Sequence, residues 1–591
     1  MNRYEKEITN LIYANDISVL VAPTGIGKTT QLPLLFAKYN AVVYCIQPTN
    51  YAVMNVYNYM RKNKSIGFMT DKITMVKKDN KIIYCTCDVV VKLLMEKKFD
   101  FCSIIMVDDS HYYSMDYELL LYLWLYFYTK TNLPKLFLSL SINDIPYIPI
   151  DISESNIVIK DEKEREIMYH DKNYKYSQTQ KLIEDCADII IELNKKRPIE
   201  KNEFSSWIIY LWDTKSKHSL LRLLKDNEDF DIMLFNKTKT LYNQRGKRLL
   251  LFVTDMNTSV TLNHVDGIID CMLEVNSFKN LSGGNKNVLR NISKSTAIQR
   301  DGRTNRVKKG FTYRMCDDEF YSFLSKHSIS EMDRVDLTQL FLKLYKYDLD
   351  PKEVFKSKLD SFTLNYYCDF IDTYELKTNK IFNLQLGLDA KHIIFISEWN
   401  KFKLPLFQGI VLAVLFNLKR PLFYYSDKNK KTYFNEHFNK FGTSILEIYC
   451  NALLHFLDEF KSLSYDELKF KSYCKENSFN YNEFKSMLDT LKSIKSKLTI
   501  NNYSVVVEKF DVDTVLDTMI PIIKDVYKDN FCHKNGKNYI NNERKVYSLN
   551  IYEHYSSSQP SDTIIMFNSS MVTDDENRNL GKKLITYYIN L

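Results

Sequence analysis

Glycine and proline are scarce in this sequence, and its cysteines form no paired motif. Of 591 residues, only 14 are glycine and 12 are proline, both well below average usage. The 11 cysteines are scattered without a CxxC pair, which disfavours zinc ligation and indicates a reducing compartment. Cys85 and Cys87, in IIYCTC, are predicted to share one strand face as buried thiols. Where two glycines stand close together, we expect the backbone geometry to require them.

Signals for export or membrane insertion are also missing. The N-terminal stretch MNRYEKEITN carries charges where a signal peptide needs an apolar run. The longest apolar segment, LLLYLWLYFY at 119–128, is too short to span a bilayer and predicts a core helix. We therefore expect a cytoplasmic protein with no membrane partner. The net charge of +8 is mild for this length, so it permits a nucleic-acid partner without requiring one.

The first half of the chain predicts an α/β fold. At about 150 residues per domain, a chain of 591 residues corresponds to roughly three to five domains. Near-continuous apolar runs alternate with helical patterns, which is typical of parallel sheets covered on both faces. The charged stretch 150–175 separates two series of runs, at 17–22, 41–46, 81–86, 103–108 and 135–141, then at 206–212, 230–236, 248–254 and 267–272.

The second half of the chain has a different pattern. From about Cys316 onward the apolar periodicity becomes helical. After about Ile500, short strands are expected in YSVVVEKF (503–510), KVYSLNIYEHY (545–555) and DTIIMFN (562–568), as in a small β-barrel. The sequence therefore predicts two α/β domains, a helical part and a small β-domain.

A glycine-containing loop follows the first predicted strand. Gly25 and Gly27, in APTGIGKTT, allow the loop to wrap a phosphate with its amide N–H groups. Lys28 can reach the β- and γ-phosphates of ATP, and Thr29 can ligate Mg²⁺. A glycine turn that merely resembles such a loop is the alternative, which the strand before and the helix after disfavour. The expected ATP-binding residues of the loop are Thr24, Gly25, Ile26, Gly27, Lys28, Thr29 and Thr30.

An acidic pair ends the predicted strand at 103–108. Asp108 stands where a carboxylate that ligates Mg²⁺ belongs beside such a loop. Alone, Asp108-Asp109 would fit a helix cap or a solvated turn. Together with the glycine loop, the pair indicates a nucleoside triphosphatase in which Asp109 activates the attacking water.

A second basic and polar stretch, STAIQRDGRTNR, lies at 295–306. Arg303 and Arg306 are three residues apart, so a helix would place both on one face, within reach of a γ-phosphate. Gln299, one turn earlier, is positioned to orient the attacking water. A basic surface helix is the alternative, but the pattern QRxGRxxR is too particular for it.

These motifs, in this order, resemble those of DEAH-box RNA helicases of superfamily 2, the group that includes the poxvirus nucleoside-triphosphatase/RNA helicase. APTGIGKTTQLP resembles motif I, IQPTNYAV resembles motif Ia, and VDDSH takes the place of DEAH. Ser139-Leu140-Ser141 resembles the SAT motif, TDMNTSVTL from Thr254 resembles motif V, and ISKSTAIQRDGRTNR resembles motif VI. Weaker likenesses cover nearly all of the remaining chain.

The resemblance implies two tandem RecA-like parallel-sheet domains followed by winged-helix, helical-bundle (ratchet) and OB-fold-like domains. The expected boundaries are 1–150 and 151–316 for the RecA-like domains, 317–390 for the winged helix, 391–500 for the ratchet and 501–591 for the OB-fold.

The resemblance also implies roles for residues outside the nucleotide motifs. His111, Ser139 and Ser141 would couple hydrolysis to motion, and Thr86 and Thr254 would hold nucleic-acid phosphates. Between motifs V and VI, Gly283-Gly284 predicts a hairpin turn. In relatives a hairpin at this position acts as a wedge between paired strands, and an ordinary surface hairpin is the alternative.

The sequence departs from the family pattern at three places. Thr49 and Asn50 replace an arginine pair of motif Ia that grips the nucleic-acid backbone. Tyr59 aligns with an arginine that stacks on adenine; it would either stack there or pack into the core. Asp109 replaces a glutamate, which withdraws the carboxylate by about 1.5 Å. Because Lys28 and the QRxGRxxR residues remain, we expect an active site.

The favoured prediction is an ATP- and Mg²⁺-dependent helicase that moves 3′→5′ along single-stranded or tailed duplex RNA. One alternative is a hydrolysis-impaired nucleic-acid-binding subunit, such as a transcription or assembly factor, and another is a DNA helicase. Lys, Asn, Ile and Tyr are abundant, and their codons are AT-rich. This bias suggests a viral or cytoplasmic genetic element, with transcription or virion proteins as partners. We expect a monomer.

Overall fold

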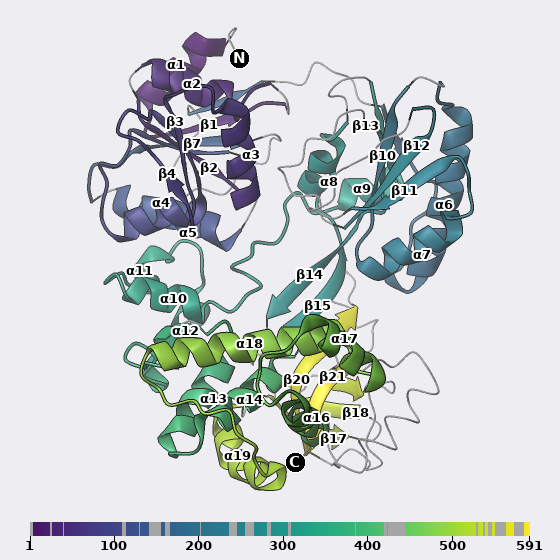
Figure 1. Cartoon of the computed structure of the whole chain (residues 1–591). Coiled ribbons are helices and arrows are strands. Elements are labelled where there is room, and N and C mark those ends of the chain that lie inside the picture. The colour runs from purple at the N-terminus through teal and green to yellow at the C-terminus, as the bar shows by residue number, and fades with distance from the viewer. Residues whose placement is uncertain are drawn as a thin grey trace.

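The computed structural model places two sheet lobes above a mostly helical C-terminal part (Figure 1). It describes residues 4–23, 26–39, 41–108, 114–128, 130–140, 155–159, 166–200, 203–235, 245–254, 265–279, 285–304, 309–384, 386–418, 422, 445–527, 530–535, 538–541, 546–549, 563–572 and 584–590.

The first lobe contains an eight-stranded sheet in the order β4-β3-β5-β2-β6-β7-β1-β8. Every neighbouring pair is parallel except β3 and β4. Its strands are β1 (Ile17–Val21), β2 (Val43–Gln47), β3 (Ile66–Met69), β4 (Thr74–Met75), β5 (Ile82–Thr86), β6 (Ile104–Val107), β7 (Lys135–Leu140) and β8 (Asn156–Val158). The apolar runs of the first series are thus confirmed as strands, and the sheet continues beyond residue 150 through β8.

Helices cover both faces of this sheet because its strands are buried on both sides. Its helices are α1 (Glu5–Ala14), α2 (Gln31–Lys38), α3 (Asn50–Met60), α4 (Cys87–Met95) and α5 (Met115–Tyr128). Side chains of α1 to α3 belong to one core cluster, and those of α4 and α5 belong to another. The apolar segment at 119–128 is confirmed as a core helix, with Trp124 fully buried.

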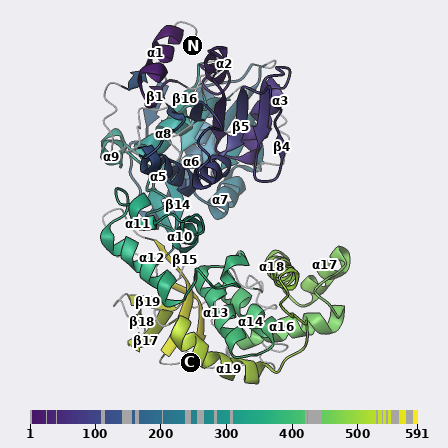
Figure 2. The same cartoon turned by 90° about the vertical axis from the view of Figure 1, so that its left-hand side faces the viewer.

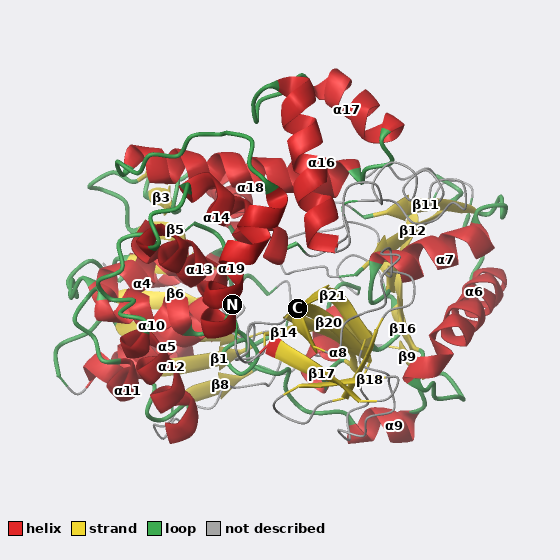
Figure 3. Ribbon diagram, turned by 90° about the horizontal axis from the view of Figure 1, so that it is seen from below, coloured by secondary structure: helices red, strands yellow, loops and turns green. Residues whose placement is uncertain are grey.

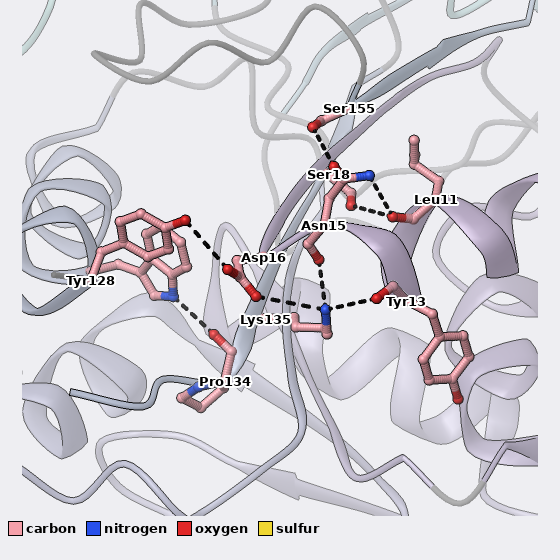
Figure 4. A network of polar contacts seen from close by, with 10 residues as sticks. Leu11, Tyr13, Asn15, Asp16, Ser18, Tyr128, Pro134, Lys135 and Ser155 are labelled. Carbon is pink, nitrogen blue, oxygen red and sulfur yellow. Dashed lines mark hydrogen bonds and ion pairs between the residues drawn. The ribbon is translucent and has the colours of Figure 1, made fainter.

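A polar network fixes the amino-terminal edge of the first sheet (Figure 4). Lys135 Nζ donates to the carbonyl oxygens of Tyr13 at 3.3 Å and Asn15 at 2.8 Å. A cation at this position offsets the unpaired carbonyl groups at the end of α1. Lys135 also lies 3.7 Å from Asp16, and Ser155 donates to the Asn15 side chain at 2.9 Å. These contacts hold α1, β7 and the segment before β8 together, away from the carboxyl edge that carries the motifs.

The second lobe contains a fully parallel sheet in the order β11-β12-β10-β13-β16-β9. Its strands are β9 (Glu166–Tyr169), β10 (Ser205–Tyr210), β11 (Phe230–Leu234), β12 (Arg248–Val253), β13 (Val265–Asp270) and β16 (Phe311–Arg314). Its helices are α6 (Thr179–Lys196), α7 (Thr214–Leu224), α8 (Lys294–Asp301) and α9 (Asp318–Phe323). The second series of apolar runs is therefore also confirmed.

A long hairpin leaves the second lobe and enters the C-terminal part (Figures 1 and 2). It consists of β14 (Leu273–Lys279) and β15 (Asn285–Asn291), which pair antiparallel. The predicted hairpin is confirmed, while its turn at Gly283-Gly284 lies outside the described residues. β15 also pairs in parallel with β20 (Thr563–Val572), from Asn285 opposite Asn568 to Leu289 opposite Val572.

The C-terminal part combines a helical bundle with a ring of strands (Figure 3). Its helices are α10 (Thr338–Tyr345), α11 (Pro351–Val354), α12 (Ser361–Thr373), α13 (Ala390–Lys401), α14 (Leu406–Phe416), α16 (Ile445–Phe460), α17 (Glu467–Glu476), α18 (Tyr481–Ile500) and α19 (Val512–Val526). The ring of strands consists of β20, described above, and four further strands: β17 (Phe531–Asn535), β18 (Asn538–Asn541), β19 (Val546–Leu549) and β21 (Leu584–Asn590). The pairings run β20–β17–β18–β19–β21 and back to β20, with β19–β21 parallel and the others antiparallel.

The first lobe meets the C-terminal part at a buried carboxylate. Glu118, in α5, is 5% exposed, and Ser330 Oγ lies 2.6 Å from each of its oxygens. Lys358 Nζ lies 3.3 Å from Glu118, and the Met115 amide donates to Glu331 at 2.8 Å. Because α5 begins a few residues after Asp108, this junction connects the acidic motif to the C-terminal part.

Two local predictions are wrong. The segment 503–510 forms no strand; it has no regular secondary structure and packs against the helical core with Val505 and Phe510 buried, and the helix α19 follows. Cys87 does not share a strand face with Cys85, because β5 ends at Thr86 and Cys87 begins α4. Across the described part of the chain, no helix combines the length and apolarity needed to cross a membrane.

Candidate active site

The glycine loop connects β1 to α2 at the carboxyl edge of the first sheet. Gly27 has φ +98°, and a Cβ there would lie 2.8 Å from Gln31 Cγ, so this position requires glycine. The Gly27 carbonyl accepts from the Gln31 amide at 2.8 Å and so begins the helix. Amides at a helix start are a ready anion site. Of the predicted loop residues, Thr24 and Gly25 lie outside the described residues, and Ile26 and Thr30 lie on the described stretch leading into α2.

Lys28 is folded into the loop. Its side chain is 6% exposed, and Nζ donates to the carbonyl oxygens of Ala22 at 2.7 Å and Pro23 at 2.9 Å. A buried ammonium group needs such partners to offset its lost hydration. The carbonyl contacts hold the cation inside the curve of the loop, where an anionic phosphate would be enclosed.

Asp108 collects hydrogen bonds from two strands and the loop. Thr29 Oγ1 donates to Asp108 Oδ2 at 2.5 Å, and Gln47 Nε2 donates to the same oxygen at 3.1 Å. Ser139 Oγ donates to Oδ1 at 3.3 Å. These groups meet because β2, β6 and β7 are parallel neighbours whose carboxyl ends share one edge. The predicted metal ligands, Thr29 and Asp108, are therefore brought together, and Ser139 contacts one of them.

Tyr84 supports the loop from beneath. Its hydroxyl donates to the Thr29 carbonyl at 2.8 Å. Burial raises the pKa of Tyr84, and the neighbouring Cys45 and Asp108 add to the shift, so the hydroxyl remains a neutral donor. Sequence reasoning missed Tyr84 and Gln47. Gln47 is the last residue of β2, and Tyr84 lies two residues before the end of β5; a polar group near the end of a strand at this edge is the signal that identifies them.

The second lobe presents its motif on and just after α8. Gln299 lies on α8 and is half-buried, and Arg303 is 8% exposed. α8 ends at Asp301, where Gly302 forms the cap, so Arg303 lies in the turn after the helix. The helical face that the sequence predicts Arg303 to share with Arg306 is therefore not formed at Arg303. The expected helix stops early at Gly302, since glycine is a poor helix former.

Several predicted residues lie outside the described residues. These are Asp109, His111, Ser141 and Arg306, together with Thr24 and Gly25. Their roles stay predictions.

The residues that replace the motif Ia arginines make hydrogen bonds within the first lobe. Thr49 caps α3 by accepting from the Ala52 amide at 3.1 Å, and Asn50 donates to Asp71 at 3.1 Å. Tyr59, on α3, is 79% exposed. The core alternative for Tyr59 is therefore wrong, while stacking on adenine stays a prediction.

The two predicted nucleic-acid contacts end strands of different lobes. Thr86 is the last residue of β5 and is 8% exposed, and its Oγ1 has no hydrogen-bond partner among the described residues. A buried hydroxyl without a partner is uncommon, and a ligand or an ordered water would complete its hydrogen bonding. Thr254 directly follows β12 and is half-buried.

No protein-family model matches this chain. The chain is 24% identical to the ATP-dependent RNA helicase HrpA of Borreliella burgdorferi over 382 residues, which cover 58% of this chain and 44% of HrpA. It is 21% identical to the ATP-dependent RNA helicase DEAH11, chloroplastic, of Arabidopsis thaliana over 535 residues, 83% of this chain and 29% of that protein. Both relatives are ATP-dependent RNA helicases by name. The chain spans less than half the length of either of these helicases.

Solved helicase structures share the fold. The Escherichia coli DEAH/RHA helicase HrpB superposes with a TM-score of 0.63 at 13% identity, covering all of this chain and 70% of HrpB. The two lobes are accordingly RecA-like parallel-sheet domains, followed by a helical C-terminal part as in the helicase neighbours.

Proposed function

We propose that this chain is an ATP-dependent RNA helicase. The observation that carries the proposal is the convergence of Lys28, Thr29 and Asp108 at one sheet edge. A buried ammonium beside a hydroxyl–carboxylate pair fits a nucleoside triphosphate with its divalent cation. The names of the helicase relatives supply the class of reaction and the RNA substrate.

Each residue then has a role at the triphosphate. Lys28 stabilises the charge of the β- and γ-phosphates, and Gln299 orients the attacking water. Asp109 accepts the proton of that water. Arg303 and Arg306 stabilise the charge that develops on the transferred phosphoryl group. Thr29 and Asp108 offer the hard oxygen ligands that Mg²⁺ prefers, and this cation would neutralise charge on the phosphates.

Nucleic acid would be held across both lobes. Thr86 ends β5 and Thr254 directly follows β12 at the carboxyl edges of the two sheets. The Thr86 hydroxyl, which has no hydrogen-bond partner in the part of the chain that the structure describes, supports a phosphate contact there. Grip through the backbone is independent of sequence. We propose 3′→5′ movement on single-stranded or tailed duplex RNA, with Ser139, Ser141 and His111 coupling hydrolysis to closure of the lobes.

We further propose the finer architecture of the C-terminal part. The closed ring of five strands, with one parallel pairing between β19 and β21, supports an OB-fold-like domain. The short helices α10 to α12 support a winged-helix-like unit over 317–390, and α13 to α18 support a ratchet-like bundle over 391–500. We also propose that the protein is a monomer in a reducing cytoplasm. Its proposed source is a viral or other cytoplasmic genetic element, and its proposed partners are transcription or virion proteins.

ATP turnover with and without nucleic acid tests the proposed function. Single-stranded RNA should stimulate phosphate release by the full chain, and DNA of equal length should stimulate it less. Equal or stronger stimulation by DNA would favour a DNA helicase. RNA binding without turnover would favour the hydrolysis-impaired subunit, for which the shortened Asp109 is the specific observation.

A further inference from the structure

The hairpin β14–β15 is joined to α8 at its root. Met272 precedes β14, and Ile292 follows β15; the Ile292 amide donates to the Met272 carbonyl at 3.0 Å and closes the base. Ser293, the next residue, caps α8. Met272 and Ile292 pack with Ala297 of α8 in one buried cluster. The helix that carries Gln299 therefore begins where the hairpin ends.

Asp270 connects the same two elements by polar contacts. Its Oδ1 accepts from Arg300 Nη1 at 2.6 Å and from the Met272 amide at 2.8 Å. Asp270 is 1% exposed and Arg300 7%. Met272 has φ +60°, a left-handed conformation that side chains other than glycine rarely adopt. The Asp270 contact stabilises this bend, at which the chain turns from the sheet into the hairpin.

Arg300 is held on its other side as well. Its guanidinium lies 4.6 Å from the centre of the Tyr210 ring at the end of β10. Burial alone would lower the pKa of Arg300, but Asp270 and Tyr210 outweigh this and raise it, so the group stays charged. A buried charge pair of this kind is costly to separate. Arg300 and Asp270 therefore stay paired when either element moves.

The far end of the hairpin is fixed in another domain. β15 pairs with β20 in the C-terminal sheet, from Asn285 opposite Asn568 at the end away from the root to Leu289 opposite Val572 nearer the root. The hairpin thus has its root on α8 and its other end in the C-terminal ring (Figure 1).

We propose that Asp270 and Arg300 are positioning residues that make α8 and the hairpin β14–β15 move as one unit. This inference rests on the proposed function. A displacement of Gln299 and Arg303 at the nucleotide is then transmitted to the hairpin and to β20. Neither Asp270 nor Arg300 touches ATP in this arrangement; their contribution is to link phosphate chemistry to strand separation.

A matched control exists in the same lobe. Asp301 and Arg314 form a second buried ion pair, 2.7 Å long, with both side chains under 5% exposed. It joins α8 to β16 rather than to a strand of the hairpin. The double variants Asp270→Asn/Arg300→Gln and Asp301→Asn/Arg314→Gln each remove both charges, so neither leaves an unpaired charge that would prevent folding.

Hydrogen exchange on the full chain without nucleotide tests the joint itself. The Asp270→Asn/Arg300→Gln variant should speed exchange at Met272 and Ile292 by about tenfold, because a charge-assisted contact that holds the bend is lost. The Asp301→Asn/Arg314→Gln variant should leave these two amides unchanged. Equal exchange at the hairpin root in both variants would overturn the proposal, whatever the ATPase activity.

The number of duplexes separated per ATP hydrolysed tests its consequence. This ratio should fall by about tenfold in the Asp270→Asn/Arg300→Gln variant and by less than about twofold in the control pair. An equal change in both would overturn the proposal. Absence of ATP turnover in the unmodified chain would instead count against the proposed function, and the exchange experiment would still decide the role of Asp270.

Discussion

Thr29 and Asp108 lie on different elements, and the Thr29 hydroxyl donates to the Asp108 carboxylate at 2.5 Å. This hydrogen bond fixes the loop after β1 and the end of β6 to each other. The same carboxylate accepts from Ser139, so the proposed metal ligands and a proposed coupling residue form one network. Such preorganisation lowers the cost of ordering the site during catalysis.

Lys28 is the first residue to test. Lys28→Ala removes the cation that the Ala22 and Pro23 carbonyls hold inside the loop. ATP turnover should fall by roughly 10³-fold or more, because charge on the phosphates is no longer stabilised. Phosphate release by the purified full chain measures this, with Lys38→Ala, an exposed lysine of α2, as the control. Near-normal turnover in Lys28→Ala would contradict the enzyme assignment.

Asp109 is tested by two substitutions. Asp109→Asn keeps the size of the side chain but removes the basic oxygen, so ATP binding should survive while hydrolysis falls by about 10²–10⁴-fold. Asp109→Glu restores the longer acid of the helicase family. A misplacement of about 1 Å can cost on the order of 10²-fold, so its effect reports whether the pocket suits the shorter side chain. Full turnover in Asp109→Asn would show that Asp109 is not the base.

The proposed wedge role of the hairpin turn is tested separately from the phosphate site. Deleting Gly283-Gly284 while keeping β14 and β15 should impair duplex separation and leave RNA-stimulated ATP turnover nearly unchanged, because a wedge performs no phosphate chemistry. The strands themselves must be kept, since β15 pairs with β20. Replacing the two glycines with alanines is the control for turn composition. A parallel loss of both activities would mean that the turn is structural.

Glu118 predicts a pH dependence of stability. Burial raises its pKa above the usual 4.5, although Ser330 and Lys358 act in the opposite direction. The folded chain therefore binds this proton more tightly, and the resulting stability is present below about pH 4.5 and lost as pH rises through the raised pKa. Glu118→Gln lacks this titration. Its melting temperature relative to the unmodified chain should increase as pH rises from about 4.5 to about 8; a constant difference would contradict the assignment.

Much of the first two domains follows from sequence because parallel strands buried on both faces give unbroken apolar runs. β1, β6 and β12 were all predictable for this reason, as was the phosphate loop from its glycines. Short strands such as β8 and β16 were not predictable, because a strand of three or four residues is too short to show a periodic pattern. The strand predicted at 503–510 failed because alternation alone does not supply a pairing partner.

The individual residues of the site were predictable from the sequence, but most of the contacts between them were not. Lys28, Thr29 and Asp108 follow from motif spacing, and the structure places Thr29 against Asp108. Asp270 and Arg300 carry no such signal, because their pairing depends on how β13 and α8 pack across 30 positions of chain. The position of Arg303 beyond α8 follows instead from Gly302, which caps the helix.

Strand displacement is the most direct test of the central claim. RNA duplexes with a 3′ tail, RNA duplexes with a 5′ tail and the matching DNA duplexes are incubated with the full chain, with and without ATP. The proposed function predicts ATP-dependent separation of the 3′-tailed RNA duplex, little separation of the 5′-tailed one, and none with Lys28→Ala. ATP-independent separation, or none of any duplex despite RNA binding, would contradict it.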